Sequence, residues 1–139
     1  MSRFSLCLSL LLGLIALTAN GQEKLRFNRD IRPILSENCF SCHGPDSASR
    51  KADLRLDERD AAVELGAIVP GDVKASSLLA RVLTDSDDER MPPPETKKSL
   101  TVEQKELLKR WIEQGAEYEP HWACIPPAKN LAPPDVSAI

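Results

Sequence analysis

Apolar residues recur at helical spacing in short segments of this chain, and loops rich in proline, glycine and charged residues separate these segments. In residues 30–38, Ile31, Ile34 and Leu35 fall on one side of a helix. Pro33 is compatible with that helix, because a proline in the first turn removes no intrahelical hydrogen bond. The pattern therefore predicts a first helix over residues 30–38.

The middle of the chain carries shorter signals. Residues 58–65 predict one or two helical turns that end at Gly66, and residues 69–72, Val-Pro-Gly-Asp, predict a turn. A second helix is predicted from one of the two serines at 76 and 77 through Val82. Its expected buried side consists of Leu78, Leu79, Val82 and Leu83.

The last helix has the clearest pattern. Thr101 and Gln104 have the spacing of a capping box, in which each side chain binds the backbone N–H of the other residue. One stripe of the helix then carries Leu108, Trp111, Ile112 and Gly115. We predict a helix over residues 102–114, with Trp111 in the core and without a catalytic role.

One segment suggests extended backbone, because Leu54 and Leu56 alternate with charged residues. No run of strands accompanies it, so the expected fold is a small all-α domain with long loops and at most a short extended hairpin.

The first 21 residues have the form of an export signal. Arg3 is followed by an almost unbroken apolar stretch from Phe4 to Leu17, which is short for a membrane span. Small residues precede Gln22, so we expect cleavage there and a periplasmic or extracellular protein without a membrane anchor. An uncleaved helix that tethers the domain to a membrane is the alternative.

Composition sets further limits. Residues 22–139 hold 17 basic and 21 acidic residues, a net charge of −4, which argues against a nucleic-acid partner. After Glu119 the composition changes, with five prolines in residues 120–139, so we expect a domain over 22–119 and a proline-rich linker or tail after it. Few aromatic residues are available to that domain, and a large apolar ligand would complete its core.

The strongest chemical signal is the run Cys39-Phe40-Ser41-Cys42-His43. Two thiols three positions apart on a helical turn can each add to one vinyl group of a porphyrin, and the adjacent imidazole then lies under the iron. The run therefore predicts one covalently attached haem c per chain, bound through Cys39 and Cys42 with His43 as proximal ligand. We expect Trp111 beside the haem edge.

Two other interpretations of the same run stay open. A Cys-x-x-Cys pair is also found in dithiol redox centres, although the strands of such domains are missing here. It can also form half of a zinc site, for which only His121 and Cys124 remain as distant further ligands.

Haem iron needs a second axial ligand, and Met91 is the one methionine in residues 22–139. Its thioether is a soft ligand suited to haem iron, and the prolines at 92–94 restrict the loop that would present it. We predict His43/Met91 ligation, with His121 as the substitute for Met91.

Several of these motifs occur together in an order that resembles the planctomycete-type cytochrome c domain, a relative of class I cytochrome c. The resemblance runs from about Phe27 to Trp122. Its motifs are the Arg-Pro-Ile-Leu of 32–35, the Cys39–Gly44 run, 54–57, 69–72, 77–79, Met91-Pro92-Pro93 and 108–116. It implies a cytochrome c-like helical domain wrapped around haem, with Cys39, Cys42, His43 and Met91 as the matching cofactor residues.

The resemblance also implies a function. Such domains transfer single electrons to a redox partner protein or to an attached downstream domain, so we expect an electron-transfer module and not an enzyme. The family domain usually precedes large downstream domains, which makes this chain look like a truncated member. Cys124 departs from the pattern; a small buried thiol is expected there, with an intermolecular disulfide as the alternative.

One other function stays open, a haem enzyme or a gas or redox sensor in which Met91 leaves the sixth position of the iron open. Paired carboxylates, a nucleophile triad and a phosphate-binding loop are all missing from the sequence. The acidic residues of 85–89 precede Met91, and they would attract a basic redox partner.

Overall fold

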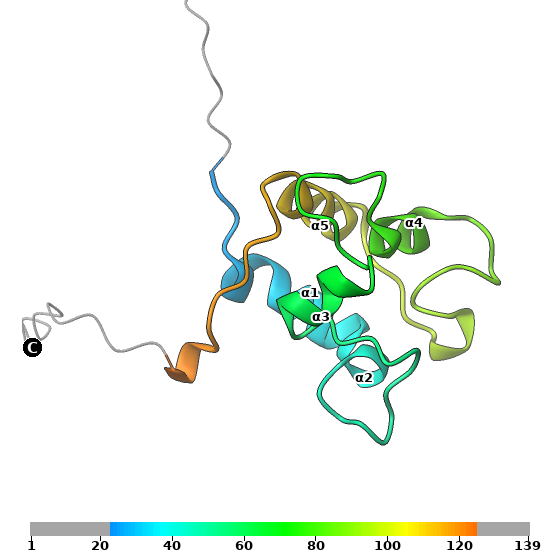
Figure 1. The fold of residues 1–139 in the computed structure, drawn as a ribbon. Helices are drawn as coiled ribbons and strands as arrows, with labels where there is room; N and C mark the ends of the chain where they lie inside the picture. Colours follow the sequence, from blue (N-terminus) through cyan, green and yellow to red (C-terminus); the bar gives the residue numbers. More distant parts are fainter. Residues whose placement is uncertain (1–22, 125–139) are drawn as a thin grey trace, which may run out of the picture.

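The computed structural model describes residues 23–124, and within this range the chain forms helices and loops but no strand (Figure 1). The predicted all-α class is confirmed. The elements are η1 (Phe27–Ile31), α1 (Arg32–Asn38), α2 (Phe40–His43), α3 (Arg59–Glu64), α4 (Ser77–Leu83), η2 (Pro94–Thr96), α5 (Val102–Glu113) and η3 (Trp122–Cys124). The predicted signal segment, 1–21, and most of the predicted tail, 120–139, lie outside the described residues.

The predicted first helix is present and starts earlier than expected. The π-helical turn η1 precedes α1, and Pro33 lies in the first turn of α1, where its missing N–H costs no helical bond. The N–H of Cys39 still donates to the carbonyl of Leu35 at 2.8 Å, so the end of α1 continues into α2. This continuity places the cysteine run directly after the first helix.

The capping box of α5 is confirmed by both of its hydrogen bonds. Gln104 N–H donates to Thr101 Oγ1 at 3.2 Å, and Thr101 N–H donates to Gln104 Oε1 at 2.9 Å. The helix ends before Gly115, whose φ of +100° belongs to the region that glycine occupies without steric cost. Leu108, Trp111 and Ile112 are buried along the predicted stripe.

The predicted helices of the middle segment are also present. α3 falls within residues 58–65, and the turn at 69–72 closes with a 2.9 Å bond from Asp72 N–H to the Val69 carbonyl. α4 buries Leu78, Leu79 and Val82 as expected. The prediction for Leu83 is wrong, because this side chain is 50% exposed: the position lies about 100° further around the last turn of α4, on its solvent side.

The predicted extended piece at Leu54–Leu56 forms no strand. Ala52 and Asp53 both have left-handed backbone conformations, with φ of 53° and 52°, and Leu54 N–H closes a turn onto the Lys51 carbonyl at 3.1 Å. Consecutive turns bring both leucines to the inside of the molecule without strand pairing. The alternation of apolar and charged residues therefore reflects burial of alternate side chains in a loop.

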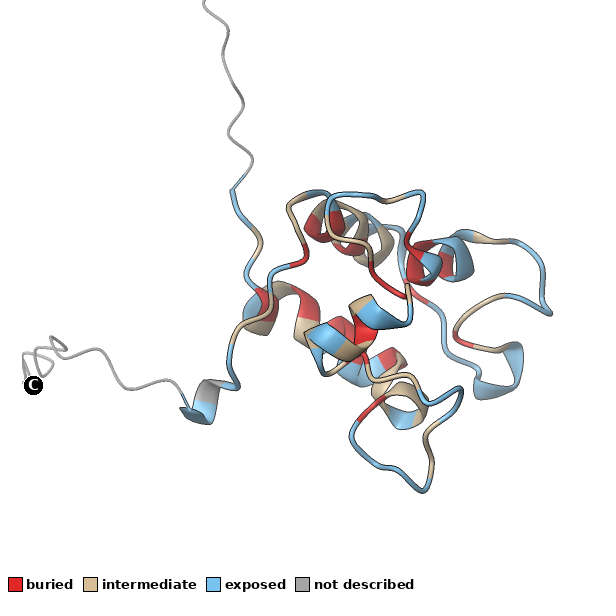
Figure 2. Cartoon of the chain, in the orientation of Figure 1, coloured by how far each residue is buried: buried red, intermediate tan, exposed pale blue. Residues whose placement is uncertain are grey.

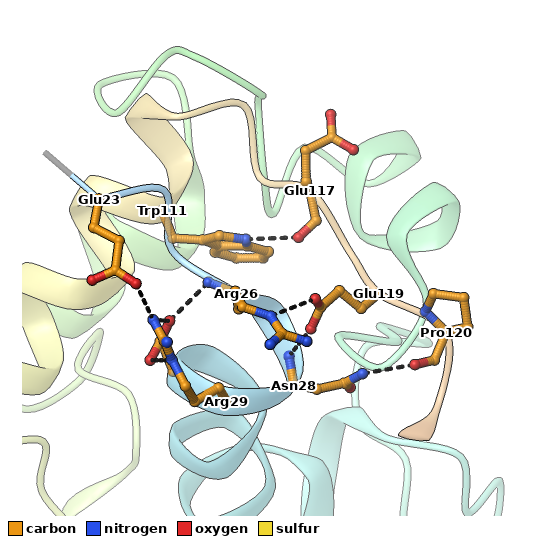
Figure 3. Close-up of polar contacts among 9 residues, drawn as sticks. Glu23, Arg26, Asn28, Arg29, Trp111, Glu117, Glu119 and Pro120 are labelled. Carbon is orange, nitrogen blue, oxygen red and sulfur yellow. Dashed lines mark hydrogen bonds and ion pairs between the residues drawn. The ribbon is translucent and has the colours of Figure 1, made fainter. Parts of the chain in front are cut away.

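The core lies between α1, α5 and α4, whose inward faces are buried (Figure 2). α1 packs against η1, η1 against α5, and α5 against α4. Phe27 stacks on Tyr118, with ring centroids 4.1 Å apart, and both rings lie against Trp111. Trp111 Nε1 also donates to the Glu117 carbonyl at 3.0 Å, so this indole is both buried and satisfied (Figure 3).

The two ends of the described chain are joined by polar contacts (Figure 3). The Glu119 carboxylate accepts from the backbone N–H of Asn28 at 2.9 Å and pairs with Arg26 at 3.1 Å. The side-chain amide of Asn28 donates to the Pro120 carbonyl at 2.7 Å. The backbone N–H of Leu25 donates to the side-chain oxygen of Gln114 at 2.8 Å. These contacts tie the segment around η1 to the end of α5 and the residues that follow it.

Truncation of the core stripe tests this packing. Leu108 is fully buried in α5, so we expect Leu108→Ala to lower the free energy of unfolding by about 2–5 kcal/mol. Val102→Ala is the control from the same helix, because Val102 is 78% exposed, and we expect a change within about 0.5 kcal/mol. Urea unfolding followed by circular dichroism measures both. Equal losses in the two variants would contradict the assigned core face.

The contact at Glu119 predicts a pH dependence. The N–H of Asn28, followed by the neighbouring Arg26, holds the pKa of Glu119 below its ordinary value of 4.5. A carboxyl with a lowered folded pKa stabilises the fold above its unfolded pKa and loses that contribution as pH falls through the folded value. We therefore expect Glu119→Gln to lower the Tm near neutral pH, with the gap from the wild type closing below about pH 4.

Glu117→Gln is the matched control for that experiment. The Glu117 side chain is exposed, and its backbone carbonyl accepts the Trp111 N–H. Its Tm should follow the wild type at every pH. A Glu119→Gln gap that stays constant down to pH 3 would show that the carboxylate contributes nothing through its charge.

Candidate haem site

A pocket of about 380 Å³ lies between the cysteine run, the turns at 52–56 and α4. This size falls within the range of about 300–1,000 Å³ that is usual for small-molecule sites. Three of the four predicted cofactor residues, Cys39, His43 and Met91, line it together although Met91 is far away in sequence. The fold thus brings the predicted proximal and distal ligands to one cavity.

The backbone of Lys51 orients the His43 imidazole. His43 Nδ1 lies 3.2 Å from the Lys51 carbonyl oxygen, and a carbonyl only accepts, so the proton of the neutral ring is on Nδ1. The lone pair of Nε2 is then available to a metal, which is the usual arrangement of a histidine ligand and its carbonyl partner. Lys51 N–H also donates to the Cys42 carbonyl at 2.7 Å, so the backbone of Lys51 is held on both sides of its Cα.

Arg50 holds the loop that carries Lys51. Its guanidinium donates to the Gly44 carbonyl at 3.1 Å and to the Pro45 carbonyl at 3.0 Å. Because the loop leaves α2 at Gly44 and returns at Lys51, these bonds tie its beginning to its end. The Arg50 side chain therefore holds the loop in a conformation that keeps the Lys51 carbonyl beside the His43 imidazole.

The two cysteines of the run differ in their surroundings. Cys39 lines the pocket, whereas Cys42 is half-buried one turn further on and is not among the lining residues. Both are free thiols. Burial raises the pKa of the Cys39 thiol to about 11, against a smaller opposing effect of Lys98. A dithiol redox centre needs a lowered thiol pKa, so the Cys39 environment argues against that interpretation.

Met91 reaches the pocket from the loop that follows α4. Its backbone N–H donates to the Arg81 carbonyl at 2.9 Å, and the next residue, Pro92, is buried. A hydrogen bond on one side and a buried ring on the other hold the residue at the pocket wall without regular structure. The expected role of the prolines in this loop is therefore consistent with the observed backbone.

Three other candidates from the sequence do not line this pocket. His121 lies beyond the Glu119 contact, next to η3, and Trp111 faces Phe27 and Tyr118 in the core. The expectation that Trp111 is a core residue is confirmed, and its place beside the haem edge stays a prediction. The expected buried thiol at Cys124 is wrong, because Cys124 is exposed where the chain leaves the core. Residues 23–124 contain no group of three or more His, Cys, Asp or Glu side chains suited to hold a metal ion.

Sequence patterns do not mark most of the pocket wall as part of a site. The remaining lining residues are Ala52, Leu54, Leu56, Leu65, Ala67, Ser77, Leu78, Arg81 and Val82. The four from α4 occur at positions i, i+1, i+4 and i+5, which is one helical face. That spacing marks Arg81 as a neighbour of two apolar wall residues, but periodicity alone does not separate a core face from a ligand-binding face.

The wall fits a large flat apolar group that carries a metal. The lining is mainly aliphatic, with one imidazole and one thioether as the metal-binding side chains. Leu65 is 54% exposed although it lines the pocket, so it is left partly uncovered by the protein itself. A bound porphyrin would cover it and supply the apolar contacts that the thin aromatic content of the chain does not.

Residues 39–95 match a family model described as Planctomycete cytochrome C. This segment is a planctomycete-type cytochrome c domain. The match begins at the first cysteine of the run and ends shortly after Met91, so it is narrower than the stretch from Phe27 to Trp122 over which the sequence resembles the family. The comparison with curated proteins finds no match, and the comparison with solved structures finds none.

A cytochrome c domain implies haem as its cofactor. Every wall of the pocket described above belongs to the matched segment. Cytochrome c domains are typically exported proteins, and none of the helices within residues 23–124 has the length and hydrophobicity that a membrane span requires.

The glycine after the haem motif provides a test of this geometry. A Cβ atom at Gly44 would clash with the backbone oxygen of Phe40, and backbone cannot move away as a flexible side chain can. We expect Gly44→Ala to displace the end of α2, cost about 3 kcal/mol of stability, and lower the haem content of the purified protein severalfold.

The haem-to-protein ratio and thermal unfolding measure the effect of Gly44→Ala. Ser41→Ala is the control, because Ser41 is exposed on the same short helix. Full haem content and an unchanged Tm in Gly44→Ala would show that the close approach to Phe40 is not required.

Proposed function

We propose that this domain is an exported one-electron carrier with a single covalently bound haem c. Cys39 and Cys42 provide the thioether links, and His43 and Met91 are the axial ligands. The observation that carries the proposal is that His43 and Met91, 48 positions apart, line one pocket together with Cys39.

Each residue has a defined task in this proposal. The Lys51 carbonyl keeps the proton of His43 on Nδ1, so that Nε2 is the ligand atom. Met91 supplies a soft, uncharged sulfur, which favours the ferrous state relative to harder ligands. The aliphatic wall excludes water from the metal. When bound, haem iron supplies a one-electron couple between the ferric and ferrous states.

The proposal requires no substrate site. With His43 and Met91 both holding haem iron, no open position would remain for a substrate. The bound haem would supply one-electron exchange with a redox partner protein or an attached domain. The acidic residues of loop 85–89 are exposed next to Met91, and Asp87 pairs with Arg90 at 3.0 Å. Attraction of a basic partner to this loop stays a prediction.

Absorption spectroscopy of the exported protein tests the proposal. We expect a covalent c-type spectrum with a weak far-red band from sulfur bound to ferric iron. Met91→Leu keeps the side-chain volume and removes the sulfur, so it should abolish the far-red band while the haem remains attached. Leu65→Ala is the control from the same wall, and its far-red band should persist.

Two results would contradict the proposal in different ways. Absence of haem from the exported wild type would remove the cytochrome function altogether. A far-red band that survives in Met91→Leu, or rapid carbon monoxide binding by the reduced wild type, would show that Met91 is not a firm ligand and would favour a haem enzyme or a gas sensor.

A further inference from the structure

Arg81 joins the pocket wall to the loop that carries Met91. It is the one arginine or lysine among the residues that line the pocket. It contacts the loop at two points, since its carbonyl accepts the Met91 N–H at 2.9 Å and its Nη1 donates to the Glu89 carbonyl at 3.2 Å. Within residues 23–124 Arg81 makes no ion pair with a carboxylate.

These two contacts restrain different parts of the loop. The backbone bond fixes the peptide of Met91 itself, and the side-chain bond fixes Glu89, two residues earlier. Residues 85–89 between α4 and Met91 are exposed, so packing contributes little to their position. The other bonds of this loop are local: the N–H groups of Glu89 and Arg90 bind the Ser86 carbonyl, and Arg90 pairs with Asp87. Among the described residues, only the Arg81 guanidinium, a charged and therefore stronger donor, ties Glu89 to α4 through a side chain.

We propose that Arg81 is a positioning residue for Met91, and that its guanidinium limits how often the thioether leaves the pocket. This inference rests on the proposed role of Met91 as axial ligand. In this inference the Arg81 side chain strengthens the binding of Met91 to the metal, in addition to what the thioether contributes.

Ligand competition provides the main test. Imidazole displaces a methionine from ferric haem, and the loss of the far-red band reports the displacement. In Arg81→Leu, we expect the imidazole concentration at half-loss to fall about tenfold, which corresponds to the loss of one charged hydrogen bond. Arg81→Lys keeps a cationic donor and should recover part of this loss.

Arg59→Leu is the matched control. Arg59 Nε donates to the Ala116 carbonyl at 3.3 Å, so it also makes an arginine–carbonyl bond, but it does not line the pocket. A general loss of stability would affect both variants, whereas loosening of Met91 should affect Arg81→Leu alone.

Hydrogen exchange gives a second readout that does not depend on haem. The Met91 amide is bound to the Arg81 carbonyl, and its exchange reports opening of the loop. We expect about tenfold faster exchange in Arg81→Leu, with and without haem, and wild-type exchange in Arg59→Leu.

The outcomes separate the two proposals. Unchanged imidazole competition and unchanged Met91 exchange in Arg81→Leu would overturn the role of Arg81. A wild type without a far-red band would overturn the ligand role of Met91, and the exchange data would still decide whether Arg81 holds the loop.

Discussion

The backbone of Lys51 is the constraint on which the cysteine–histidine run and its imidazole depend. Its N–H binds the Cys42 carbonyl and its carbonyl faces His43 Nδ1, so one residue fixes both the backbone and the imidazole of the motif. Leu56 N–H adds a 2.9 Å bond to the His43 carbonyl. The five-residue motif is too short to hold an imidazole in one orientation by itself, because α2 is only one turn long. The loop that returns to it supplies the missing restraint.

The opposite wall is restrained in a different way. α4 packs on α5, and α5 packs on η1, which continues through α1 into the haem motif. The two walls of the pocket are therefore connected through the core and the contacts between the chain ends, on the side away from the pocket. Two arginines add local restraints. Arg50 binds the Gly44 carbonyl on the side of the cysteine run, and Arg81 binds the Glu89 carbonyl on the side of α4. This division explains how a domain with so few aromatic residues keeps a cavity of defined shape.

The sequence predicts well those features that depend on neighbouring residues. The capping box at Thr101 and the buried stripe of α5 need only local spacing, and both are present. Prediction fails where position depends on distant contacts. Leu83 fits the apolar pattern but faces solvent at the end of its helix, and Cys124, expected to be a buried thiol, is exposed.

The candidate site shows the same division. The cysteine–histidine run points to Cys39, Cys42 and His43 by chemistry, and composition leaves Met91 as the remaining soft ligand, so a candidate ligand set can be proposed without a fold. The pocket wall cannot be predicted in this way, because Leu54 and Leu56 reach the pocket after a turn with left-handed residues and not through a strand. Arg81 is the clearest case. Its sequence neighbours place it on a helix face, but only the folded loop shows that it binds Glu89 and Met91.

The arrangement also has a consequence for how the domain responds to its cofactor. Leu65 lines the pocket and is 54% exposed, so apolar surface of the pocket wall remains uncovered by protein. A group that fills the pocket stabilises the folded state by mass action, because it contacts surfaces that are assembled only in that state. Covalent links at Cys39 and Cys42 would make this stabilisation permanent. Haem would then act as the missing part of the core as well as the redox centre.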